Sequence, residues 1–207
     1  MQNIIQIANG ILIGGVGGGG GGVDPFVGLL DAYPGASAAY SVRLLKSDYT
    51  GGLVEIRGEN SATTTIATDT FYPDANNEFS LTSETAGGVS VSTWMSTNSI
   101  VNGFVRTWYD QSGNGNNATQ LSPSIQPKII VSGSLLLLNS MPVLDMSFGT
   151  SKLLVPSFAA AAPSIFTVSA LKSGTSTGTI ISGGDDINNR FDFGVVSATN
   201  YRIFVNQ

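Results

Sequence analysis

The sequence predicts an all-β fold, either a sandwich or a barrel, and three observations support this class. Short runs of β-branched and aromatic residues recur at intervals of about 8–12 residues. Clusters of Gly, Asn, Asp and Ser separate these runs, as they do in turns. No long amphipathic helix and no alternation of strands with helices breaks this pattern. The expected strands are Leu53–Arg57, Thr63–Thr68, Phe71–Tyr72, Phe104–Tyr109, Lys128–Val131, Leu135–Leu138, Val143–Met146, Ile165–Leu171, Thr179–Ile181, Phe191–Val195 and Tyr201–Val205.

Three segments need separate interpretation. Ala36–Leu45 contains Ala, Leu and Arg, which favour a short helix, but it also suits an edge strand. Leu135–Leu138 is apolar throughout, which fits a strand buried on both faces or a strand of ambiguous register. A short helix is expected near Ser92–Met95, within a stretch rich in Ser and Thr.

The composition is typical of extracellular and virion β-proteins. The 207 residues suffice for one large all-β domain, and 42% of them are hydrophobic, which is enough for a core. Charged residues make up only 11%, against roughly a quarter in ordinary domains. Gly, Ser, Thr and Asn take their place. The net charge of −5, with few Lys and Arg, argues against a nucleic-acid partner.

The chain contains no cysteine and no histidine. Disulfides and thiolate zinc sites are therefore excluded. Catalysis by a serine–histidine pair is excluded as well, because histidine is its general base. Any chemistry must come from carboxylates, hydroxyls, amides or a hard cation.

Residues 1–23 are predicted to form an anchoring arm and a linker. The apolar run Ile4–Ile13 is too short to span a bilayer. A secretory signal would require a basic residue near its start, but the first basic residue of this sequence is Arg43. Gly17–Gly22 is an unbroken glycine run, a flexible tether by composition. An exposed apolar arm on a tether is expected to dock on other chains. The alternatives are a disordered tail and a first strand supplied to its own domain. The predicted anchoring residues are Ile4, Ile5, Ile7, Ile11, Leu12 and Ile13.

The stretch Trp108–Gln120 is the densest polar segment and the candidate ligand site. A strand ends there in a turn, where Gly113 and Gly115 can take positive φ and neighbouring polar side chains can bond the backbone. Aromatic rings can stack on sugars, and exposed amides can contact hydroxyls. The alternatives are that Asp110 caps its own turn and that the aromatics pack in the core. The candidate glycan-binding residues are Trp108, Tyr109, Asp110, Asn114, Asn116 and Asn117.

A second candidate site lies near the end of the sequence. Asp185, Asp186 and Asn188 offer hard oxygen ligands in a loop preceded by two glycines, as Ca²⁺ prefers. The alternative is a solvated turn between two strands. No cofactor other than this Ca²⁺ is expected.

An ordered series of segments resembles a known superfamily. Ala39–Leu45, Tyr49–Gly51, Glu55–Arg57, Trp108–Asn116 and Gln126–Ile129 look like the concanavalin A-like (laminin-G-like) jelly-roll domains of phage tail, fibre and other virion surface proteins. The resemblance implies a two-sheet antiparallel sandwich over residues 24–207, short of its last strands. It also implies a structural protein at the virion surface, anchored by its arm to other virion proteins. Such a protein is expected to form a homo-oligomer and to adhere to cell-surface glycans through a lectin-like domain.

The central motif also resembles the catalytic domain of α-L-arabinofuranosidases. Retaining glycosidases need two carboxylates, and the nucleophile of that family is a Glu in an Asp-Met-Glu-Asn segment. Here Asp145-Met146 is followed by Ser147-Phe148, and no Glu follows Glu84. We therefore assign no catalytic residue. A secreted glycoside hydrolase and a structural spacer without ligand remain the alternatives.

Overall fold

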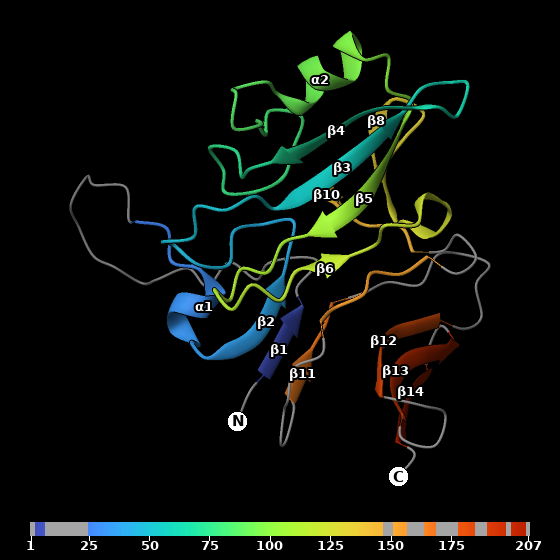
Figure 1. Cartoon of the computed structure of the whole chain (residues 1–207). Coiled ribbons are helices and arrows are strands. Elements are labelled where there is room, and N and C mark those ends of the chain that lie inside the picture. The colour runs from blue at the N-terminus through green and yellow to red at the C-terminus, as the bar shows by residue number, and fades with distance from the viewer. Residues whose placement is uncertain are drawn as a thin grey trace. The chain divides into compact units, whose positions relative to one another are not determined.

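The computed structural model describes residues 3–6, 25–146, 151–156, 164–168, 178–184, 190–197 and 200–205 (Figure 1). The chain divides into two compact units, Met1–Val168 and Ser169–Gln207. Most of the described secondary structure is β, mainly in antiparallel sheets, which confirms the all-β class. The predicted boundary between residues 23 and 24 lies outside the described residues.

Six strands of the first unit form the main sheet. Their order is β4-β3-β5-β7-β8, and β6 also pairs with β5. All of these pairings are antiparallel. In Figure 1 the three longest strands of this sheet, β3, β4 and β5, lie side by side. The strands are β3 (Val54–Glu59), β4 (Thr65–Phe71), β5 (Asn102–Trp108), β6 (Ala118–Thr119), β7 (Lys128–Val131) and β8 (Ser134–Leu135).

The inner face of this sheet carries the hydrophobic core. Side chains alternate between the faces of a strand, so Val54 and Ile56 of β3 are fully buried on the inner face. Gly58 follows on the same face, where an added Cβ would lie 2.7 Å from the Trp94 ring and 2.5 Å from Ile100. Glycine is needed there because no larger residue fits. The core also contains Phe71, Phe79, Val105, Trp108, Ile129 and Ile130.

The helix predicted near Ser92–Met95 is present as α2 (Val91–Thr97). The Ser90 hydroxyl accepts a hydrogen bond from the backbone N–H of Thr93 at 3.2 Å, which satisfies one of the free donors at the start of the helix. The Trp94 ring of α2 meets Phe71 edge to face, with ring centroids 5.3 Å apart.

A second sheet of the first unit has the order β11-β1-β2. Both pairings are parallel, which differs from the antiparallel expectation. Ala36–Leu45 contributes β2, so the strand alternative for this segment is confirmed, and helix α1 comes before it. The elements are β1 (Asn3–Gln6), α1 (Leu29–Ala32), β2 (Ala36–Tyr40) and β11 (Ser164–Phe166).

The position of β1 bears on the predicted arm. Ile4 and Ile5 pair with β2 and β11 of the same chain, as in the alternative that the arm supplies a strand to its own domain. The other predicted anchoring residues, Ile7, Ile11, Leu12 and Ile13, lie outside the described residues.

Strand predictions were wrong at three places: Asp69, Leu135–Leu138 and Val143–Met146. The sequence predicts a break at Asp69, but β4 continues through it. β4 is an edge strand, so the Asp69 side chain remains partly exposed. The segment Leu135–Leu138 is not one strand buried on both faces. It is divided between β8 and β9 (Leu137–Leu138), and Leu137 is 56% exposed.

The next turn explains the second error. Asn139 and Ser140 both have positive φ, at 51° and 65°. Such a two-residue turn folds β9 back on β10 (Met141–Pro142) as a hairpin. The strand expected at Val143–Met146 is reduced to an isolated bridge between Asp145 and Lys128.

The second unit contains an antiparallel sheet of the order β12-β13-β14. These strands agree with the last three predicted strands, Thr179–Ile181, Phe191–Val195 and Tyr201–Val205. They are β12 (Gly178–Gly184), β13 (Arg190–Ser197) and β14 (Asn200–Val205). In the described part of the chain, no helix is long and apolar enough to span a membrane.

Candidate functional site

The predicted glycan loop uses its carboxylate internally. Asp110 is 4% exposed. Its Oδ1 accepts hydrogen bonds from the N–H groups of Ala39 and Ser112, each at 2.8 Å. Its Oδ2 accepts from the Ser112 hydroxyl at 2.8 Å and from the Asn116 N–H at 3.0 Å. A carboxylate has about four acceptor positions, so Asp110 is saturated by the protein and caps its own turn.

Gln111 extends the same arrangement to the chain that follows β2. It is fully buried. Its Nε2 donates to the carbonyls of Ser41 at 3.0 Å and Arg43 at 2.9 Å, and its Oε1 accepts from the Leu45 N–H at 2.8 Å. One side-chain amide thereby satisfies three backbone groups that no strand pairs, which buried polar groups require.

The side chains of the asparagines in the loop also form hydrogen bonds with groups of the same chain. Asn114 Nδ2 donates to the carbonyls of Ala36 at 2.9 Å and Ser37 at 3.2 Å. Asn116 Nδ2 donates to the Ser37 carbonyl at 2.8 Å. Asn117 Oδ1 accepts from the Asp110 N–H at 3.0 Å. We call residues 110–117 the latch, because their side chains fasten this loop to residues 36–45.

The predicted aromatic residues lie at the base of the latch. Trp108 is 4% exposed and packs against Tyr40, with ring centroids 5.8 Å apart. The Tyr40 hydroxyl donates to the Asn116 carbonyl. Burial, together with the nearby charge of Asp110, raises the pKa of Tyr40 far above its ordinary value. Tyr109 is half-buried, and its hydroxyl lies 2.9 Å from the Thr70 hydroxyl. Trp108 therefore belongs to the core, as in the packing alternative.

A second polar site lies on the outer face of the main sheet. The register places Arg57 of β3 opposite Phe104 of β5, and Phe104 opposite Lys128 of β7. The Arg57 guanidinium lies 4.4 Å from the centre of the Phe104 ring, and the Lys128 ammonium lies 5.4 Å from it. Both distances are within the range of cation–π attraction.

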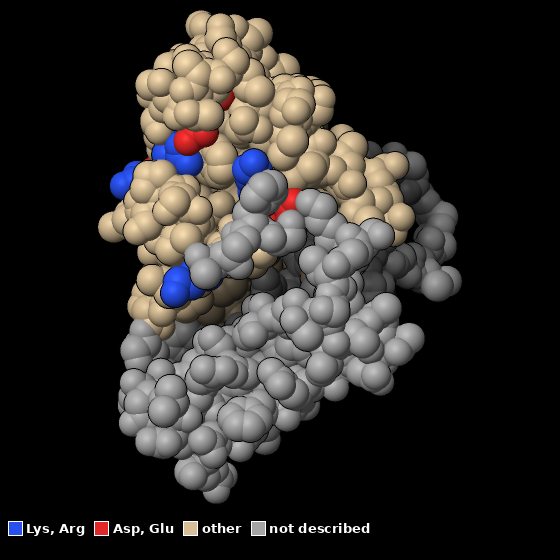
Figure 2. All heavy atoms as spheres, turned by 90° about the vertical axis from the view of Figure 1, so that its right-hand side faces the viewer, with Lys and Arg blue, Asp and Glu red and all other residues tan. Residues whose placement is uncertain are grey.

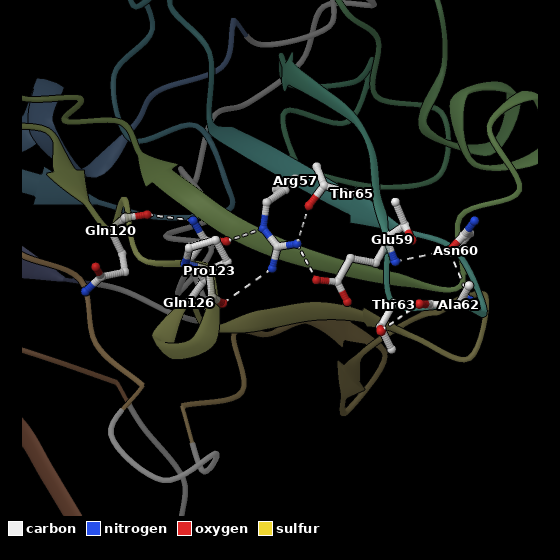
Figure 3. A network of polar contacts seen from close by, with 10 residues as sticks. Arg57, Glu59, Asn60, Ala62, Thr63, Thr65, Gln120, Pro123 and Gln126 are labelled. Atoms are coloured by element: carbon white, nitrogen blue, oxygen red, sulfur yellow. Dashed lines mark hydrogen bonds and ion pairs between the residues drawn. The ribbon is translucent and has the colours of Figure 1, made fainter.

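Arg57 is fixed by a network that Figure 3 shows from close by. It is 5% exposed. Its Nε donates to Gln126 Oε1 at 2.7 Å, and its Nη1 donates to Thr65 Oγ1 at 2.9 Å and to Glu59. Its Nη2 donates weakly to the Pro123 carbonyl at 3.4 Å. The buried cation is therefore paired with a carboxylate and held in one orientation.

The loop on the other side of the network is held by Gln126. Its Nε2 donates to the Gln120 carbonyl at 2.6 Å. This bond spans the short 3₁₀ helix Pro123–Ile125, which forms one wall of a hollow of about 430 Å³. We call this hollow the groove. It is lined by Arg57, Glu59, Phe104, Ser124, Gln126 and Lys128, among others.

Sequence reasoning missed the groove. Its charged and aromatic residues come from three strands, and nothing in the sequence gives the register between them. The only signal is the alternation along β3, where Glu55, Arg57 and Glu59 share the outer face. That pattern predicts a polar face but not a hollow.

A larger hollow of about 680 Å³ lies beside the edge strand β4. Glu55 and Asp69 both line it. Glu55 accepts hydrogen bonds from Arg106 Nη1 at 3.1 Å and from the Thr107 hydroxyl at 2.8 Å. Cross-strand partners share a face, so the pairing of Ile56 with Asp69 places Asp69 on the inner face, opposite to that of Glu55. The two carboxylates therefore do not form a facing pair.

The predicted Ca²⁺ ligands Asp185, Asp186 and Asn188 lie outside the described residues. Within the described ranges, no group of three or more carboxylates is arranged to hold a metal ion. Figure 2 shows one face of the molecule, on which Lys, Arg, Asp and Glu are few and lie in small separate groups.

Comparisons with protein-family models, with curated proteins and with solved structures give no match to this chain. The interpretation of the two sites therefore depends on their geometry and on the sequence resemblance.

Proposed function

We propose that this chain is a structural protein of a phage virion surface that displays a two-sheet jelly-roll domain outward. The observation that supports this proposal most is the latch. The segments that carry the sequence resemblance, Ala39–Leu45 and Trp108–Asn116, are the segments that the latch joins. In this proposal, the shared motif stabilises the fold. A display protein and an enzyme of the same superfamily can share a fold without sharing a function.

The same observation removes Asp110 as a candidate for a glycosidase carboxylate. A glycosidase carboxylate must be available to a sugar or a water molecule. Asp110 is instead saturated by four donors of its own chain. The motif that resembles a glycosidase thus carries a structural role at this position.

In this proposal, the first segment attaches the protein to other virion proteins or to further copies of itself, and the displayed domain adheres to cell-surface glycans. The apolar residues Ile11 and Leu12 belong to this segment but lie outside the strand β1. They can therefore be changed without altering the residues that pair in β1.

The test compares the full chain with a double variant, Ile11→Ser and Leu12→Ser. We expect the full chain to enter assembled particles, or to form a defined oligomer, and the variant to remain folded but unassembled. Particle incorporation and mass by light scattering measure assembly, and circular dichroism checks the fold. Equal assembly of both proteins would contradict attachment through this segment. A variant that loses its fold would show that the segment serves its own domain instead.

A further inference from the structure

We propose that the hollow beside β4 binds an amino sugar, with the protonated amine of the sugar at the carboxylate of Asp69. We call this hollow of about 680 Å³, lined mainly by residues of β4, of α2 and of the segment 85–89, the β4 hollow. The inference rests on the proposed adhesion to glycans and narrows it to one site and one class of sugar. It goes beyond the sequence prediction, which placed glycan contacts in the latch.

Asp69 occupies a position where the strand would be expected to carry an apolar residue. Side chains alternate between the faces of a strand, so Ala67, Asp69 and Phe71 share the inner face of β4. Phe71 is fully buried, and Ala67 packs against the core. Asp69 is only partly exposed, yet its carboxylate has no hydrogen bond or ion pair with any described residue. A carboxylate that is partly removed from water without a partner lowers the stability of the fold, so we infer that its partner is a ligand.

The charges of the β4 hollow favour a cation. The described residues that line it include two carboxylates, Glu55 and Asp69, and no Lys or Arg. Glu55 is compensated, because it pairs with Arg106 at 3.1 Å and accepts a hydrogen bond from the Thr107 hydroxyl at 2.8 Å. Asp69 is not compensated. A single ammonium group matches its charge and can donate three hydrogen bonds, whereas a sugar carboxylate or a phosphate would be repelled.

The other groups of the β4 hollow suit a sugar ring. Thr68 and Thr97 carry hydroxyls that can donate or accept hydrogen bonds, and neither hydroxyl is bonded to a described residue. Val89 is 39% exposed and Tyr72 is half-buried, so both offer apolar surface to the C–H face of a ring. An amino sugar supplies an ammonium group, hydroxyls and a C–H surface within one residue. A simple amine supplies only the first.

The test uses the full chain with two main probes, an oligomer of glucosamine and an oligomer of N-acetylglucosamine of the same length, whose amines are acetylated and neutral. A third probe, cadaverine, supplies amines without a sugar ring. A slightly acidic buffer keeps the sugar amines protonated. The variant is Asp69→Asn, which keeps the shape of the side chain and removes its charge. The matched control is Asp48→Asn, the same change at a side chain that is 71% exposed and does not line the hollow.

We expect the glucosamine oligomer to bind about tenfold more tightly than the acetylated oligomer, since a hydrogen bond to a charged group contributes about this much. Asp69→Asn should remove this preference, so that both oligomers bind equally, and Asp48→Asn should keep it. Amide chemical shifts during titration should change in β4 and α2. Thermal unfolding should show that Asp69→Asn remains folded, because the Asp69 carboxylate has no partner in the described chain to lose.

Three results would overturn the inference: no binding of the glucosamine oligomer, equal binding of the two oligomers by the unchanged protein, or a preference for glucosamine that persists in Asp69→Asn. Binding of cadaverine as tight as that of the glucosamine oligomer would overturn the assignment to a sugar. Binding of the acetylated oligomer alone would keep the proposed adhesion and remove only this site, whereas assembly through the first segment is measured separately.

Discussion

The latch and the groove are both built around a buried charge, but they use it in opposite ways. The carboxylate of Asp110 accepts hydrogen bonds at all of its acceptor positions from its own chain. The donors belong to residues 39, 112 and 116. Arg57 is also fixed by partners, yet it lies against a hollow that a ligand can enter. A charge that is saturated by backbone groups holds a fold, whereas a fixed charge beside open space can serve recognition.

The comparison also shows why polar density along the sequence marks the latch and not the groove. The latch contains many polar residues in a short segment because it has to satisfy many backbone groups that no strand pairs. The groove draws one or two residues from each of several elements, so no part of the sequence stands out.

The largest expected effect comes from Asp110→Asn. The amide would place an N–H₂ group against backbone N–H donors that now point at a carboxylate, and the charge-assisted hydrogen bonds would be lost. We expect the free energy of unfolding to fall by about 3 kcal/mol, measured by denaturant unfolding. Asp48→Asn is the control, because the Asp48 side chain is 71% exposed. A loss as small as that of the control would show that the latch does not hold the fold.

A second pair of variants compares the glutamines of the two sites. Gln111→Leu leaves two carbonyls and one N–H of residues 41–45 without partners, and we expect a loss of about 2–3 kcal/mol. Gln126→Leu removes one bond to Arg57 and one to the Gln120 carbonyl. Water in the groove can replace the bond to Arg57, so its loss should be smaller, about 1 kcal/mol. If Gln126→Leu lowers the free energy of unfolding more than Gln111→Leu does, the distinction between the two sites is wrong.

The sequence was sufficient for the strands whose pattern is local. β3 follows from alternation and β7 from a β-branched run, and α2 lies where a short helix was expected within a stretch rich in Ser and Thr. It was not sufficient for β4, because a partly exposed edge strand tolerates Asp69. The turn at Asn139–Ser140 was missed because neither residue is a glycine, although both have positive φ.

For the sites, sequence reasoning identified the latch residues and gave them two roles, contact with a ligand and contact with the protein's own fold. It listed turn capping by Asp110 as an alternative, and this role is confirmed. What it lacked was the position of Ala36–Leu45 beside the loop, since that contact joins segments far apart in the sequence. The groove depends on strand register in the same way.

Asp74 gives a smaller version of the Asp110 arrangement and should be sensitive to pH. Burial alone would raise its pKa, but hydrogen bonds from the Ser80 hydroxyl and from the N–H groups of Glu78 and Asn76 lower it below the ordinary value of 3.8. Its ionised form therefore stabilises the fold above that value, and this contribution is lost as the pH falls through the lowered pKa.

Ser80→Ala removes one of these bonds. We expect a loss of about 1 kcal/mol at pH 7 that shrinks as the pH falls below the ordinary carboxyl range. Thermal unfolding at a series of pH values measures it, and Ser96→Ala on the exposed side of α2 is the matched control. A loss that does not change with pH would show that the Ser80 hydroxyl acts independently of the Asp74 charge.

The most direct test of the claim that the latch holds the fold compares the unfolding midpoint of Asn114→Ala in the latch with that of Asn76→Ala, a control at an exposed residue. Asn114 donates to the Ala36 and Ser37 carbonyls of β2, so its variant should unfold at a lower temperature. The control should unfold at the same temperature as the unchanged protein. If Asn114→Ala also leaves the unfolding midpoint unchanged, the latch does not hold the fold and the account is contradicted.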